Sequence, residues 1–178
     1  MVVCWIRSAQ YTTSMPAFDV LRRYLSARAV FTADDFAFIE TVFFPRRLLS
    51  EEFLQRAGDV ACYASFVATG CLRSYLVDST GKEHTVQLAP ESCWLADSAS
   101  LSTKAPSPYF VQAIEDSDLL LIDPMSHDML VRRIPAYGAS FQPGSQTQAA
   151  ELDQPIEQPI TATLRERYLR FLKARAGS

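Results

Sequence analysis

The sequence predicts a mainly β domain with flanking helices, folded as an antiparallel β-roll of the jelly-roll type. Between residues 46 and 123, apolar and polar residues alternate in eight short runs that are separated by turn-forming residues. Helical periodicity is found on both sides of this region. The chain has 178 residues, of which 48% are hydrophobic and 11% aromatic, and this is enough to bury one core.

The first expected helix starts near Met15. Ser14 is a candidate cap and Pro16 suits the first helical turn, while one apolar face carries Phe18, Leu21 and Leu25. Residues 1–14 precede this helix without a clear helical or strand period. We therefore expect them to be a poorly ordered extension.

The second expected helix begins at "TADDFAFIETVF". Thr32 and Asp35 have the spacing of a capping box, with aspartate in place of the usual glutamate. Pro45 is expected to end the helix. The expected buried stripe consists of Phe36, Ile39 and Phe43.

Eight strands are expected between the helices. Gly58, Gly70 and Gly81 lie at turns where tight hairpins require positive φ, so their role is structural. A short helix from Ser126 to about Arg133 follows, then a proline break and the start of another helix. The expected strands are the runs 46–50, 51–55, 61–68, 71–78, 84–89, 92–96, 109–116 and 118–123.

The sequence after the predicted domain, which spans residues 15–141, divides into two parts. Residues 142–160 contain five glutamines and three prolines, and each proline inside a helix costs about 3 kcal/mol. We therefore expect a flexible linker there. Residues 161–178 are expected to form a basic amphipathic helix of net charge +4, which leaves −7 for residues 1–160.

Composition excludes several classes of function. Residues 1–160 are acidic, so we do not expect them to bind the phosphate backbone of DNA. No apolar run is long enough to cross a membrane. The four cysteines form no close pair, so we expect reduced thiols. Two histidines, His84 and His127, are too few for a metal-dependent barrel enzyme, and no serine or cysteine lies in a nucleophile motif. We expect a cytoplasmic protein that is not an enzyme and holds no metal.

The segments "RAGDVACYASFVATGCLRSYLVDSTGKEHTVQLAPE" and "AIEDSDLLLID" resemble the effector domain of the Crp/Fnr family of bacterial transcription regulators. "LRRYL", "FFPRRLL" and "RERYLRFL" are similar to segments of the branch of this family that is common in Bacteroidetes. The resemblance covers Phe18 to Lys173. It implies a cyclic-nucleotide-binding β-roll (a double-stranded β-helix), coupled through a long dimer helix to a winged helix-turn-helix.

The resemblance also locates a phosphate cradle between Leu95 and Phe110, in a loop with one helical turn. In family members that bind a cyclic nucleotide, a glycine, an acid, a short helix and an arginine hold the ribose and the phosphate. The candidate residues in this sequence are Ala96, Asp97, Ser98, Lys104, Pro108 and Tyr109.

The expected cradle is degenerate, because Ala96 replaces the glycine and Pro108 the arginine. If the backbone had positive φ at Ala96, the alanine would be strained there. Asp97 is expected either to accept a hydrogen bond from a ribose hydroxyl or to cap the loop helix. Lys104 either substitutes for the arginine's charge or is a solvated surface lysine. Three aromatic residues are expected either to stack on a ligand or to fill the pocket: Trp94, Tyr109 and Phe110.

The expected function is that of a ligand-sensing regulatory domain of the Crp/Fnr type. No cofactor is certain, and the expected ligand is a cyclic nucleotide or another small effector. A second copy of the chain is the other candidate partner. Because residues 142–160 interrupt the implied dimer helix and residues 161–178 resemble only the start of the DNA-binding module, we expect no sequence-specific DNA binding. The alternative is a ligand-free protein-interaction or dimerisation scaffold of the same fold.

Overall fold

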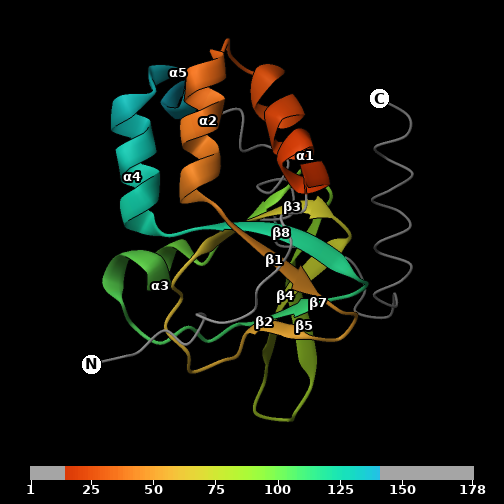
Figure 1. The fold of residues 1–178 in the computed structure, drawn as a ribbon. Helices are drawn as coiled ribbons and strands as arrows, with labels where there is room; N and C mark the ends of the chain where they lie inside the picture. Colours follow the sequence, from red (N-terminus) through yellow and green to blue (C-terminus); the bar gives the residue numbers. More distant parts are fainter. Residues whose placement is uncertain (1–14, 141–178) are drawn as a thin grey trace.

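Eight antiparallel strands form two four-stranded sheets in the computed structural model, which describes residues 15–140 (Figure 1). The expected extension 1–14, linker 142–160 and basic helix 161–178 lie outside the described residues. One sheet has the order β1 (Phe44–Leu48), β8 (Ser117–Ile122), β3 (Ala64–Thr69), β6 (Trp94–Leu95). The other has the order β2 (Phe53–Gln55), β7 (Phe110–Ala113), β4 (Cys71–Val77), β5 (Glu83–Pro90). The predicted β-roll is confirmed.

Two helices precede the strands, as predicted. α1 (Met15–Ser26) buries Leu21 and Leu25 on the expected face. α2 (Ala33–Val42) is preceded by the predicted capping box, in which the Thr32 hydroxyl accepts from the Asp35 amide at 3.1 Å and the Asp35 carboxylate accepts from the Thr32 amide at 2.8 Å. The box satisfies backbone donors that have no partner inside the helix.

Pro45 does not end α2, contrary to the sequence-based expectation. The helix ends at Val42, Phe43 is already extended, and β1 begins at Phe44. Pro45 is therefore a strand residue. It is tolerated because β1 is at the edge of its sheet, where one side of the strand donates no ladder hydrogen bonds.

Two helices follow the strands. α4 (Pro124–Arg133) begins two residues before the expected Ser126, because Asp123 caps it by accepting from the Ser126 amide at 2.9 Å. Pro124 fits the first helical position, where its missing amide hydrogen has no consequence. α5 (Pro135–Ala139) is the second helix expected after the proline break.

The sheets and helices enclose two apolar layers. Figure 1 shows α1, α2, α4 and α5 on the same side of the sandwich, and they pack against the outer face of the β1-β8-β3-β6 sheet through Phe66 and Leu120. The second layer lies between the two sheets and includes Leu48, Val67, Leu72, Val111 and Leu119. Alternation along each strand thus divides the first sheet's side chains between two cores.

His127 on α4 and Tyr137 on α5 connect the last two helices. The Tyr137 side chain is fully buried, and its hydroxyl lies 3.1 Å from Nδ1 of His127. Burial raises the pKa of Tyr137, so its phenol stays protonated. Burial also lowers the pKa of His127, against the opposing effect of the Asp128 charge. The neutral imidazole is therefore the form that the fold favours.

Acidification is expected to destabilise the fold through His127. Because the pKa of His127 in the folded state lies below the ordinary 6.5, the unfolded chain binds its proton more readily, and stability is lost as pH falls below that value. We expect wild type to lose more free energy of unfolding than His127→Gln between about pH 7.5 and about pH 5.5, measured by urea unfolding. An equal loss in both proteins would contradict this prediction.

Candidate ligand-binding site

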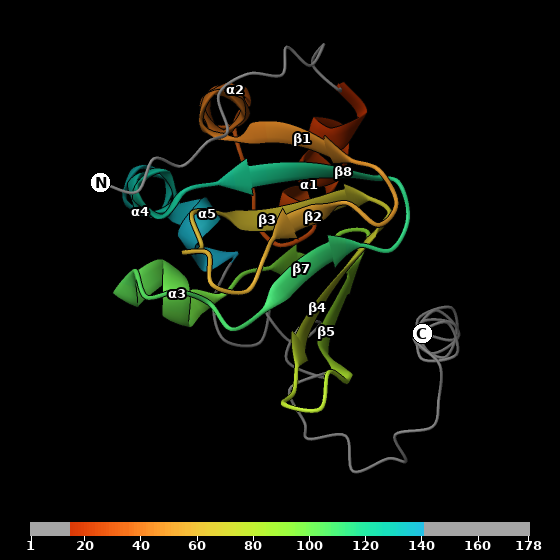
Figure 2. The ribbon, with the colours of Figure 1, turned by 90° about the horizontal axis from the view of Figure 1, so that it is seen from below.

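The segment between β6 and β7 contains the predicted helical turn, α3 (Ser98–Thr103). α3 lies at the same end of the strands as α4, at the left in Figures 1 and 2, but outside the helical layer that covers the first sheet. Ala96, Asp97 and Ser98 precede and begin it, whereas Lys104 directly follows its last residue. Four of the six sequence-predicted residues thus lie at the ends of one short helix, and Pro108 and Tyr109 follow further along the chain.

Asp97 is the N-cap of α3. One oxygen, Oδ1, accepts a hydrogen bond from the Ser100 amide at 3.0 Å, so the capping interpretation of this residue is confirmed. The other oxygen, Oδ2, is buried and has no hydrogen-bond partner among residues 15–140. A carboxylate oxygen shielded from water without a donor is costly. Asp97 therefore offers an unused acceptor in addition to its cap.

Ser100 anchors α3 to the roll, a role that sequence reasoning missed. Its side chain is 3% exposed, and its hydroxyl accepts from the Ala61 amide at 2.9 Å and donates to the Ala105 carbonyl at 2.6 Å. Backbone hydrogen bonds of 2.8 Å also join Ser107 to Gly58 and Asp59. These contacts fix the segment after α3 against the β2–β3 connection.

Ala96 does not have the strained backbone that replacement of a glycine would have caused. Within residues 15–140, the non-glycine residues at positive φ are Glu51, Ser92 and Lys104. Ala96 is therefore accommodated in an ordinary conformation. The lack of a glycine here carries no conformational cost in this fold.

The remaining predicted residues differ in exposure. Lys104 is exposed and lies at the opposite end of α3 from Asp97, where its backbone adopts the left-handed conformation with φ of 59°. Pro108 is exposed, whereas its neighbour Ser107 is 2% exposed and accepts from the Tyr109 amide at 3.1 Å. The buried side chain after α3 is therefore that of Ser107, which no local pattern in the sequence singles out.

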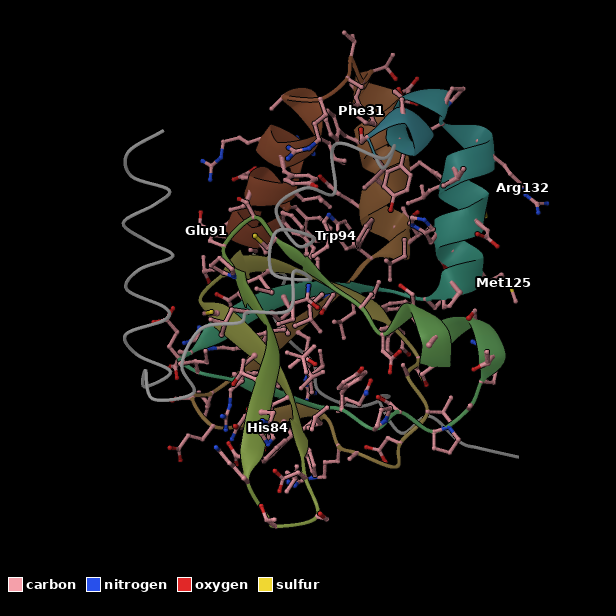
Figure 3. The ribbon with its side chains drawn as sticks, turned by 180° about the vertical axis from the view of Figure 1, so that it is seen from behind. Phe31, His84, Glu91, Trp94, Met125 and Arg132 are labelled. Carbon is pink, nitrogen blue, oxygen red and sulfur yellow. The ribbon has the colours of Figure 1, made fainter. Side chains whose placement is uncertain are left out.

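Two of the three aromatic residues near α3 are engaged in packing. Trp94 contacts Phe66, with ring centroids 5.3 Å apart, and lies where the strands meet the helices (Figure 3). Phe110 stacks on Tyr75, with centroids 5.1 Å apart and planes 15° apart. The Tyr109 side chain is half-buried. Packing thus accounts for Trp94 and Phe110 without a ligand.

The site has little positive charge of its own. From residue 94 to residue 113 the sequence contains one basic side chain, that of Lys104, and it is exposed. Among residues 15–140, no group of three or more histidine, cysteine or acidic side chains is arranged to hold a metal ion. Over the same residues, no helix is both long and apolar enough to cross a membrane.

An antiparallel roll with a short capped helix inserted between two strands is consistent with the cyclic-nucleotide-binding β-roll fold. The family model described as "Cyclic nucleotide-binding domain" matches residues 45–133, half of the chain. The chain belongs to this family. No curated protein matches the sequence.

Solved structures of regulators share the fold. The catabolite activator protein of Thermus thermophilus is 20% identical, with a TM-score of 0.54; the match covers 83% of this chain and 59% of that protein. The sensor domain of the transcriptional regulator DNR from Pseudomonas aeruginosa is 15% identical, with a TM-score of 0.58; the match covers 79% of this chain and 93% of that domain. A mutant of CooA from Carboxydothermus hydrogenoformans is 18% identical, with a TM-score of 0.56; the match covers 93% of this chain and 99% of that chain.

Proposed function

We propose that this domain is a non-enzymatic, cytoplasmic effector-binding module of the Crp/Fnr type, from the branch common in Bacteroidetes, with a degenerate phosphate cradle. In this proposal the effector binds beside α3 and changes how the domain contacts a second copy of the chain. The observation that carries the proposal is the buried Oδ2 of Asp97, which has no donor among residues 15–140. A ligand hydroxyl or amino group would supply that donor.

The lack of an arginine after α3 supports weak binding of anions at this site. A hydrogen bond to a charged group contributes about 1.5–3 kcal/mol, which corresponds to roughly tenfold to hundredfold in affinity. Ser107 and Pro108 carry no charge, and Lys104 is exposed at the far end of α3. The preferred ligand is therefore a donor-bearing molecule with little negative charge, such as a nucleoside, rather than a cyclic nucleotide.

A substitution at Asp97 tests the proposal. In Asp97→Asn the amide oxygen keeps the cap, because asparagine is as good an N-cap as aspartate, but an NH₂ group takes the place of the unused acceptor. We expect adenosine to raise the melting temperature of wild type more than cyclic AMP, cyclic GMP or cyclic di-GMP does, and Asp97→Asn to bind adenosine at least about tenfold more weakly.

Asp123→Asn is the matched control. Asp123 caps α4 in the same way, but both of its oxygens have partners in Ser126, the amide at 2.9 Å and the hydroxyl at 2.7 Å. This variant is expected to keep wild-type ligand binding. Cyclic AMP binding tighter than that of adenosine would refute the degenerate cradle. No thermal shift with any of the four ligands would instead favour the ligand-free scaffold, whose self-association light scattering would measure.

A further inference from the structure

Arg46 extends from the inner face of β1. In the β1–β8 register it is opposite Leu119, which is buried between the two sheets, and Leu48 two residues later is buried in the same layer. Because side chains alternate along a strand, Arg46 shares this inner face, whereas Arg47 is on the other face. The Arg46 side chain therefore starts between the sheets.

No described side chain neutralises Arg46. Its Nε is buried without a hydrogen-bond partner, and no carboxylate within residues 15–140 forms an ion pair with its guanidinium group. Arg46 as a whole is only partly buried, and its terminal nitrogens, Nη1 and Nη2, are not among the buried unpaired atoms of residues 15–140. Arg47 differs, since it lies 3.4 Å from Asp116 and 3.8 Å from Asp118. A partly buried cation without a counter-charge costs stability rather than adding to it.

The β1 edge around Arg46 is partly open to solvent. β1 and β2 are terminal strands of their respective sheets, so the layer between the sheets is not covered by a further strand there. Phe44, two residues before Arg46 and on the same face, is 51% exposed and packs edge-to-face on Tyr63 with centroids 6.1 Å apart. Arg46 and the half-exposed Phe44 ring thus share one face of β1 at this edge.

Arg46 is too far from α3 to replace the arginine that the cradle lacks. β1 and β6 are at opposite ends of one sheet, three strand spacings apart, which is about 14 Å. β6 leads directly into Asp97 and α3. This separation exceeds the reach of an arginine side chain, so Arg46 marks a different place.

We propose that Arg46 is the cationic contact of a second ligand site, at the β1 edge of the sandwich, which takes a small oxyanion: a carboxylate or phosphate group. The planar guanidinium fork binds such groups through two parallel hydrogen bonds, here from Nη1 and Nη2. The site does not depend on ligand binding at α3. A bound oxyanion would supply Arg46 with a counter-charge, which Arg47 already has in Asp116 and Asp118.

Anion titrations of the full chain test this site. Wild type, Arg46→Met and Arg47→Met are melted in a phosphate-free zwitterionic buffer with sodium phosphate, sodium succinate, or sodium chloride at matched ionic strength. We expect phosphate or succinate to raise the melting temperature of wild type and of Arg47→Met above the chloride control. Arg46→Met is expected to bind the same anion at least about tenfold more weakly. The anion that gives the larger rise identifies the preferred group.

Two further measurements separate a binding role from a structural one. Without added anion, Arg46→Met is expected to melt at or above the wild-type temperature, since it loses no ion pair. The arginine side-chain resonances of wild type, followed by NMR, are expected to include one set that shifts on titration and is missing in Arg46→Met. If Arg46→Met does not fold, Arg46→Lys takes its place in the same anion titrations, because lysine keeps the positive charge but lacks the planar pair of donors.

Equal anion responses in wild type and the Arg46 variant, or arginine resonances that do not move, would overturn the second site. Asp97→Asn is expected to keep the wild-type anion response while it binds adenosine more weakly. Failure of the α3 proposal and failure of this one are therefore distinguishable in the same set of proteins.

Discussion

Gly70→Ala is expected to lower the free energy of unfolding by about 3 kcal/mol. Gly70 has φ of 86°, a region in which a side chain costs about 1–2 kcal/mol. A Cβ atom there would also lie 2.6 Å from the Asp116 carbonyl oxygen and 2.8 Å from Cα of Ser117, and would overlap Oγ of Ser117. Two of these atoms are backbone, so relief requires the β3–β4 and β7–β8 turns to separate, with a further cost of about 1–3 kcal/mol.

Gly81→Ala is the control for the conformational part of this effect. Gly81 has a similar φ of 82°, but a Cβ atom there would meet nothing within 4 Å. We expect a loss of about 1 kcal/mol from backbone strain alone. Chemical denaturation of the two variants measures both losses, and the difference between them isolates the steric term. Losses of equal size would show that the two turns are free to move apart.

Elements specified by neighbours in the sequence were predictable. Thr32 and Asp35 interact across three residues, so the capping box was visible before any tertiary contact was known. The hairpin glycines were predictable for the same reason, because a tight turn imposes positive φ locally. The misplaced terminator, Pro45, shows the limit of this approach: a proline next to a helix can equally belong to an edge strand, and the sheet order decides.

The site was less predictable because its geometry depends on distant partners. Ser100 is buried, and its hydroxyl accepts a hydrogen bond from the Ala61 amide, 39 residues away. Nothing in "SASLST" distinguishes it from the exposed serines Ser98 and Ser102. Arg46 and Arg47 are adjacent, and only the register with β8 separates the inward residue from the outward one. Local sequence located the candidate segment, and long-range pairing determines which of its side chains, and which arginine of β1, point inward.

The Ser100 hydroxyl shares with the backbone hydrogen bonds of Ser107 the task of holding the candidate ligand segment, and Ser100→Ala is expected to reveal its part. The variant removes the acceptor of the buried Ala61 amide and the donor to the Ala105 carbonyl. Leaving such groups unsatisfied costs about 1–3 kcal/mol, even though alanine is the better helix former. We expect an unfolding free energy lower by about 2 kcal/mol and faster hydrogen exchange at the Ala61 amide.

Ser102→Ala is the matched control, because Ser102 is exposed on the same helix and its hydroxyl donates only to the Ala99 carbonyl within α3. Its loss is expected to stay within about 0.5 kcal/mol. Unchanged exchange at Ala61 in Ser100→Ala would mean that the backbone bonds of Ser107 hold the segment alone. Because Asp97 caps the helix that Ser100 anchors, loosening the anchor is expected to weaken adenosine binding together with stability, whereas Asp97→Asn weakens binding alone.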